Sequence, residues 1–254
     1  MNIKDICEKT PYKLLNDLGF EHFNIEQNFV LLENIHIKYN FIRKKLNSKS
    51  KIPLFITVGI SYNSFCNNLS VINNNIDKIQ ELYCEIIFFI NDLKQQHIEF
   101  TNLMKNDKDL QNYSSEEQIY LINDKMKKIL ASHYDKIIRK IIQDSKYDQI
   151  DLLGVSFGGG VFTFLAQMET IKIRQLILQA PAIFEGFRNV PISQKIILSW
   201  CIQDTKVPYK KDGKRLMKEL DNFESKIIIL TDLNDNNLDD DVTHRLQNGI
   251  FDVL

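Results

Sequence analysis

Residues 150–160 read Ile-Asp-Leu-Leu-Gly-Val-Ser-Phe-Gly-Gly-Gly, and this stretch decides the fold. Its first part is an apolar run typical of a buried strand. Its second part holds four of the nine glycines of the chain and leads into a segment with helical spacing, through about Thr170. A glycine-rich turn between a strand and a helix serves one of three purposes: it binds a phosphate, it binds a dinucleotide, or it exposes a nucleophile.

The two ligand-binding purposes fit the sequence less well. A phosphate-binding loop needs a lysine directly after its glycines, and none is present here. Gly154, Gly158 and Gly160 have a spacing similar to that of short-chain dehydrogenases. That loop normally follows the first strand of its domain, whereas too little chain follows Gly160 to complete such a fold, and no Tyr-x-x-x-Lys pair follows it. An NAD(P)-binding protein is therefore the less favoured alternative.

Ser156 lies at the centre of a G-x-S-x-G motif, which is typical of a nucleophile elbow. In such an elbow the serine occupies a strained turn, and Gly154 and Gly158 leave room for it. The start of the following helix favours the negative charge that develops during acyl transfer. The alternative is a tight turn in which Ser156 only caps the helix.

Two further residues follow Ser156 in the order Ser, acid, His. Asp204 comes directly after a predicted strand, in the segment Trp200–Pro208. Of the five histidines only His244 follows both Ser156 and Asp204. His97, in a predicted loop, is the alternative base, whereas the apolar helix face around His133 indicates a core position.

These residues resemble the α/β-hydrolase family from about Phe29 to the C-terminus. Residues 200–208 are similar to the family pattern Trp-Gly-x-x-Asp-x-x-Val-Pro, with Cys201 in place of the glycine. The resemblance implies that Ser156 is the nucleophile, His244 the base and Asp204 the residue that orients it. It also implies an oxyanion hole made by the backbone N–H groups of Phe157 and Ile60.

The same resemblance implies where the substrate pocket lies. Gly59, Ser61 and Tyr62 would line its edge, and Val58 stands where the family often has a histidine. Only a short connection separates Ala180 from Lys195, which leaves no room for a helical cap domain. We therefore expect an open or shallow pocket, edged by residues 93–114 and 181–194.

Apolar runs alternate with helical patterns along the chain, which predicts an α/β protein. We expect a single domain over residues 1–254, with residues 1–25 as an N-terminal lead-in. Its fold would be a three-layer α/β/α sandwich with a mostly parallel central sheet and no large cap. Strands are expected at 29–32, 35–42, 53–58, 85–90, 150–153, 175–180, 195–200 and 226–230, and helices at 65–82, 115–144, 157–170 and 210–222.

Composition excludes several classes of protein. The net charge of −1 argues against a nucleic-acid-binding protein. The sequence shows neither a signal peptide nor an apolar run long enough to span a bilayer, so a cytoplasmic protein with free cysteines is expected. Residues 232–243 partly resemble a calcium-binding loop, but Asn237 and Thr243 replace its glycine and its glutamate. We expect neither a metal nor a cofactor, and the oligomeric state stays open.

The sequence therefore predicts a serine hydrolase that cleaves a carboxylic ester or thioester of a small-molecule acyl substrate through an acyl-enzyme intermediate. The alternative is a catalytically inactive protein of the same fold that acts in binding. The unusual surroundings of His244 and the valine at position 58 support this alternative.

Overall fold

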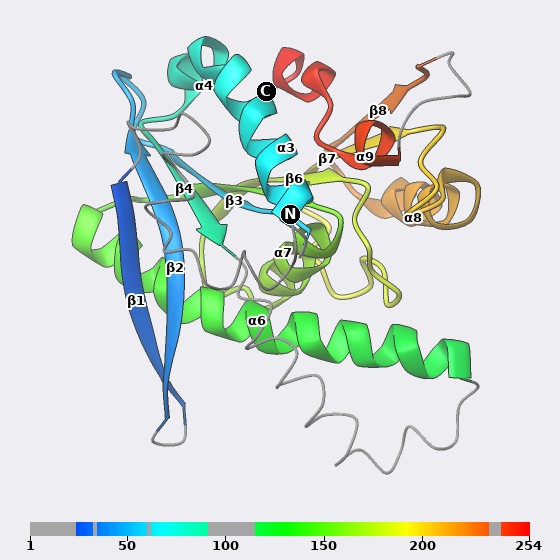
Figure 1. Cartoon of the computed structure of the whole chain (residues 1–254), viewed down its shortest axis with the longest axis horizontal. Helices are drawn as coiled ribbons and strands as arrows, with labels where there is room; N and C mark the ends of the chain where they lie inside the picture. Colours follow the sequence, from blue (N-terminus) through cyan, green and yellow to red (C-terminus); the bar gives the residue numbers. More distant parts are fainter. Residues whose placement is uncertain (1–23, 33–34, 60–61, 91–114, 234–239) are drawn as a thin grey trace.

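The computed structural model describes residues 24–32, 35–59, 62–90, 115–233 and 240–254 (Figure 1). Most of the predicted lead-in, residues 1–25, lies outside the described residues. So does the predicted loop at 93–114, and with it the proposed edge of the pocket on that side.

A sheet of eight strands forms the middle of the molecule, in the order β1-β2-β4-β3-β5-β6-β7-β8. The strands from β3 to β8 pair in parallel, whereas β1 pairs with β2, and β2 with β4, in antiparallel fashion. All eight predicted strands are confirmed. Their bounds are β1 (Asn24–Leu32), β2 (Ile35–Lys45), β3 (Pro53–Thr57), β4 (Glu85–Ile90), β5 (Ile150–Val155), β6 (Ile173–Gln179), β7 (Lys195–Cys201) and β8 (Lys226–Thr231).

Helices cover both faces of this sheet, as the three-layer prediction requires (Figure 1). One face packs against α6 (Ser115–Ser145), α7 (Phe157–Gln167) and α8 (Lys214–Glu219). The other packs against α3 (Tyr62–Asn74), α4 (Ile76–Leu82) and the 3₁₀ helix η4 (Asn248–Asp252). Short helices complete the chain: the π-helical turn η2 (Tyr209–Gly213), η3 (Leu220–Asn222) and α9 (Asp240–His244).

The segment 65–82, predicted as helical, is divided at Asn75 into two helices, α3 and α4. Asn75 has φ −110° and ψ 16°, outside the helical region. Its side-chain Nδ2 donates a hydrogen bond of 2.8 Å to the carbonyl of Val71 and one of 3.0 Å to Oδ1 of Asn248. A short amide side chain that bonds nearby backbone competes with the helix, and here it separates α3 from α4.

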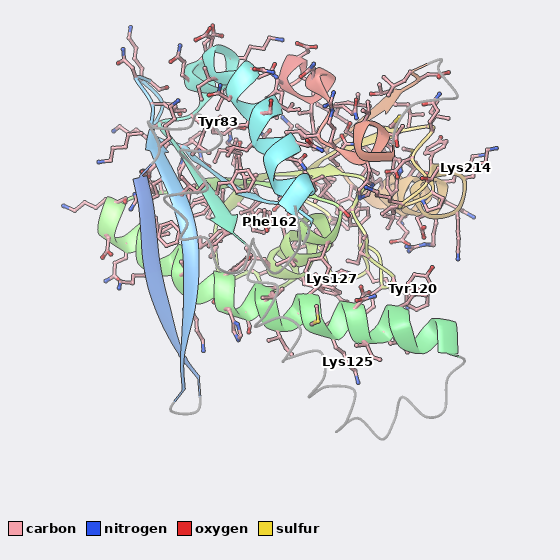
Figure 2. The ribbon with its side chains drawn as sticks, in the orientation of Figure 1. Tyr83, Tyr120, Lys125, Lys127, Phe162 and Lys214 are labelled. Carbon is pink, nitrogen blue, oxygen red and sulfur yellow. The ribbon has the colours of Figure 1, made fainter. Side chains whose placement is uncertain are left out.

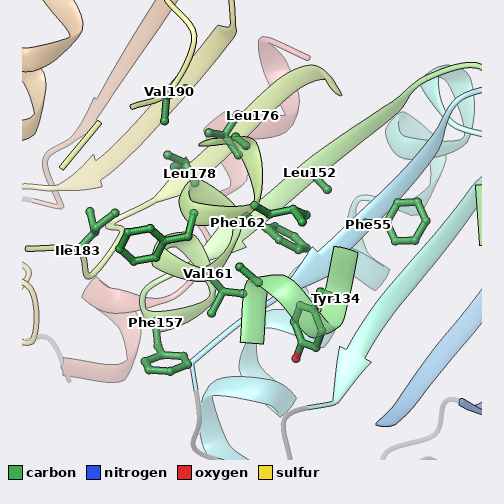
Figure 3. Close-up of a cluster of buried hydrophobic side chains, with 14 of the residues drawn as sticks. Phe55, Tyr134, Leu152, Phe157, Val161, Phe162, Leu176, Leu178, Ile183 and Val190 are labelled. Carbon is green, nitrogen blue, oxygen red and sulfur yellow. The ribbon is translucent and has the colours of Figure 1, made fainter. Parts of the chain in front are cut away.

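The larger core fixes the position of α7 against the sheet (Figure 3). Every residue of β5 is buried, and Phe162 of α7 is fully buried in the same cluster. Tyr134 of α6 stacks on Phe89 of β4 with ring centroids 4.1 Å apart. Burial of each such aromatic side chain contributes about 1.5–3 kcal/mol. The turn between β5 and α7 is therefore held from both ends by rigid elements.

Candidate active site

Ser156 occupies the sharp turn between β5 and α7 in a strained backbone conformation. Its φ is 55° and its ψ is −121°, a region that costs a non-glycine residue about 1–3 kcal/mol. The N–H of Ser156 donates to the carbonyl of Gln179 over 2.9 Å, which ties the start of the turn to the end of β6. The strand, turn and helix predicted for the G-x-S-x-G motif are therefore confirmed. The helix-capping alternative is not supported, because the Ser156 side chain makes no capping hydrogen bond.

The glycines on either side of Ser156 are required by close backbone approach. A Cβ added to Gly154 would lie 2.6 Å from the Cα of Gly159, and one added to Gly158 would lie 2.5 Å from the carbonyl carbon and oxygen of Thr57. Gly154 and Gly158 thus let α7 return tightly against β5 and the end of β3. This is the physical reason for the motif spacing.

Asp204 and His244 form a buried hydrogen-bonded pair. Nδ1 of His244 lies 2.7 Å from Oδ2 of Asp204, and the side chains are 10% and 0% exposed. The other carboxylate oxygen of Asp204 accepts the backbone N–H groups of Lys206 (2.9 Å) and Val207 (3.1 Å). Because these bonds fix the carboxylate, it can hold the imidazole in one orientation with Nε2 left for another partner.

Sheet topology places Ser156 and Asp204 at the same side of the sheet, beyond the carboxyl ends of its parallel strands. β6 lies between β5 and β7, and Val155, Gln179 and Ser199 lie in one row across the three parallel strands. Ser156 follows that row on β5, and Asp204 follows the end of β7. His244 is the last residue of α9, which contacts α3. The fold thus brings residues from three distant parts of the sequence to the carboxyl ends of the strands.

The residues of the predicted oxyanion hole and pocket edge are only partly described. Phe157 is the first residue of α7, so its backbone N–H is one of those at the helix start that have no partner within the helix. Its side chain packs into the core. Gly59 follows β3 and is half-buried. Tyr62 begins α3. Ile60 and Ser61 lie outside the described residues.

His133, Cys84 and Cys201 do not compete for these roles. His133 is buried on α6, and burial, followed by the charge of Lys136, lowers its pKa to about 4. His97 lies outside the described residues. Cys84 and Cys201 are free thiols, and burial raises the pKa of each. A protonated thiol is a poor nucleophile.

Within the described ranges, no helix is both long and apolar enough to cross a membrane. Most of the Asp-rich segment that partly resembles a calcium-binding loop, residues 234–239, lies outside those ranges.

Sequence reasoning missed a set of contacts around the turn that only the fold creates. The carbonyl of Ser156 accepts the N–H of Ala182 over 2.9 Å, which attaches the segment after β6 to the nucleophile candidate. Asp124 and Lys127, both on α6, lie beside that segment. Neither stood out in the sequence, because two charged residues in a long helix are normally a solvated face.

Comparison with known proteins identifies the fold. No family model matches the sequence, and no curated protein matches it significantly. Among solved structures, an alpha-beta serine hydrolase homologue from Coxiella burnetii has a TM-score of 0.54 at 13% identity, covering 82% of this chain and 87% of the other. A putative hydrolase from Agrobacterium vitis S4 has 0.51 at 11% identity, covering 88% and 96%. A dienelactone hydrolase from Anabaena variabilis has 0.51 at 14% identity, covering 84% and 88%.

The similarity to these structures and the strand order define the fold. The chain has the α/β-hydrolase fold, with a mostly parallel sheet between two layers of helices. Its similarity to each of these structures extends over most of both chains.

Proposed function

We propose that the protein is a serine hydrolase that cleaves a carboxylic ester or thioester of a small molecule. One observation carries the proposal: a buried carboxylate holds the His244 imidazole 2.7 Å away at the sheet edge that also presents Ser156. Nucleophilic acyl transfer requires a serine within reach of an imidazole that a carboxylate orients, and the proposal assigns these roles to Ser156, His244 and Asp204.

In the proposed reaction Oγ of Ser156 attacks the acyl carbon while Nε2 of His244 takes its proton. Asp204 holds the imidazole through Nδ1 and stabilises the imidazolium. The oxyanion is held by the N–H groups of Phe157 and Ile60, and loss of one such donor costs about 10²–10³ in rate. The bond to the leaving group then breaks, and His244 returns the proton to it. A water molecule, deprotonated by His244, releases the acid and restores Ser156.

This mechanism predicts stoichiometric acylation of Ser156. With p-nitrophenyl acetate, rapid mixing should show a burst of nearly one p-nitrophenol per protein, followed by slower turnover. Ser156→Ala should abolish the burst while its melting temperature stays close to that of the wild type. A burst that persists in Ser156→Ala would show that another residue is acylated.

The competing proposal is a hydrolase-fold protein that binds without turnover, which the valine at position 58 and the unusual sequence around His244 support. It predicts neither a burst nor hydrolysis across a panel of p-nitrophenyl esters and thioesters of increasing chain length. An NAD(P)-binding protein would instead show saturable cofactor binding in a fluorescence titration.

A further inference from the structure

The segment after β6, residues 181–187, packs directly on the turn that carries Ser156. Ala182 donates its N–H to the carbonyl of Ser156 over 2.9 Å. A Cβ on Gly159 would lie 2.8 Å from Cβ of Pro181, and one on Gly160 would lie 2.6 Å from the carbonyl oxygen of Ala182. Because there is no spare room at this contact, a shift of the segment moves the turn as well.

The carboxylate of Asp124 on α6 binds the backbone of this segment. Its Oδ2 accepts the backbone N–H groups of Phe184 and Glu185, each at 2.9 Å. The Asp124 side chain is 1% exposed, so these bonds are made in a site that excludes water, where an unmade bond is costly. Only Ile183 separates Ala182 from Phe184, so the Asp124 carboxylate, together with Arg215 Nη2 on the Ile183 carbonyl (2.7 Å), holds the backbone next to the N–H that bonds to Ser156.

Lys127, one helical turn further along α6, balances the charge of Asp124. Its Nζ donates to Oδ1 of Asp124 over 2.9 Å and lies 5.3 Å from the centre of the Phe157 ring. A Cβ on Gly160 would approach Cδ of Lys127 to 2.6 Å. Lys127 thus touches the first turn of α7, and in Figure 2 it lies on the side of α6 toward α7, with Lys125 on the opposite side. Burial lowers the pKa of Lys127, and Asp124 opposes that shift.

Stability alone does not explain this pair. A protein in which apolar residues of similar volume replace a buried ion pair is often as stable as the original, or more stable. What apolar residues cannot supply is an acceptor for two backbone N–H groups at a defined place. The geometry therefore favours a role in setting the position of the segment.

We propose that Asp124 is a positioning residue for Ser156, acting through residues 181–187, and that Lys127 is the partner that holds the Asp124 carboxylate in place. This inference rests on the proposed function, since it assigns the pair to the reactivity of the same serine. Neither residue touches the reacting atoms in this scheme.

Two double variants separate the acceptor from the charge. Asp124→Asn with Lys127→Met removes both charges but leaves an amide oxygen for the N–H groups of Phe184 and Glu185. Asp124→Leu with Lys127→Met has nearly the same shape and no acceptor. The rate of covalent labelling of Ser156 by a fluorophosphonate is measured over a range of probe concentrations, which gives the maximal rate and the half-saturating concentration separately.

The maximal labelling rate of the leucine variant should be about 10- to 100-fold below that of the asparagine variant, since a displacement near 1 Å costs that much. The half-saturating concentration should change by less than about threefold, and the asparagine variant should label within about tenfold of the wild type. Equal maximal rates in two folded variants would overturn the proposal, because the acceptor would then have no effect on Ser156.

Amide exchange of the unmodified protein tests the coupling without any variant and without activity. The N–H groups of Ala182, Phe184 and Glu185 should be protected to within about tenfold of one another, as one opening unit. Protection of Phe184 and Glu185 with free exchange at Ala182 would refute the coupling even if the leucine variant does not fold. A wild type that is never labelled at Ser156 but shows the shared protection would refute the proposed function and leave the coupling intact.

Discussion

Asp204→Asn tests how the imidazole of His244 is held. The carboxylate is 0% exposed and divides its oxygens between the imidazole at 2.7 Å and two backbone N–H groups. An asparagine can keep its oxygen on the two N–H groups, which leaves its NH₂ facing Nδ1 of His244. That NH₂ can only donate, so Nδ1 must give up its proton and Nε2 must carry one. Nε2 then cannot accept the proton of Ser156.

We expect the rate of fluorophosphonate labelling to fall about 10⁴-fold in Asp204→Asn, which is the loss seen when a triad carboxylate is replaced by its amide. That loss corresponds to about 5 kcal/mol in the activation free energy. Asp212→Asn is the matched control. Asp212 is a nearby carboxyl whose pKa is raised by burial and, to a lesser extent, by Asp204. The labelling rate of Asp212→Asn should stay within about threefold of the wild-type rate. If Asp204→Asn folds normally and still labels within tenfold of the wild type, the assignment of Asp204 is refuted.

Two further predictions concern packing and pH. Gly158→Ala places a methyl group 2.5 Å from the backbone of Thr57 and should destabilise the protein by about 1–3 kcal/mol in urea titration, whereas Gly249→Ala, whose Cβ would find its nearest neighbour at 4.0 Å, should change stability by less than about 0.5 kcal/mol. Equal effects would contradict the packing described for the turn. Burial lowers the pKa of His133 to about 4, so below pH 6.5 the unfolded chain binds a proton that the native state does not. Stability should therefore fall by about 1–2 kcal/mol between pH 7 and pH 5, and His133→Gln should remove that part of the loss. An unchanged pH dependence in this variant would show that His133 titrates normally.

Much of the fold could be predicted because its central parallel strands are buried on both faces. Every residue of Pro53–Thr57 and of Ile150–Val155 is buried, and both runs are largely apolar, which makes them visible in the sequence. The turn at Ser156 was visible for a related reason: close backbone approach demands glycine at defined spacings. Asp204 was predicted because it lies shortly after a strand, in a segment that resembles a family pattern.

What escaped prediction depends on partners far apart in the sequence. The break at Asn75 involves Asn248. Asp151 is another example: its carboxylate is buried in β5, where it binds Arg174, Tyr83 and Gln175. The contacts of Asp124 with the backbone N–H groups of residues 184 and 185 also join parts that are far apart in the sequence. A helix pattern shows which face is apolar, but it does not tell which charged residue on its border finds a buried partner in the folded chain.

The central claim is that Ser156 is an activated nucleophile. Its most direct test is mass spectrometry of the protein after brief exposure to a fluorophosphonate, with peptide mapping of the adduct. We expect a single adduct on the peptide that carries Ser156, formed at a much lower rate in His244→Ala and not at all in Ser156→Ala. A folded wild-type protein that gains no adduct, or one that gains it equally in Ser156→Ala, would contradict the claim.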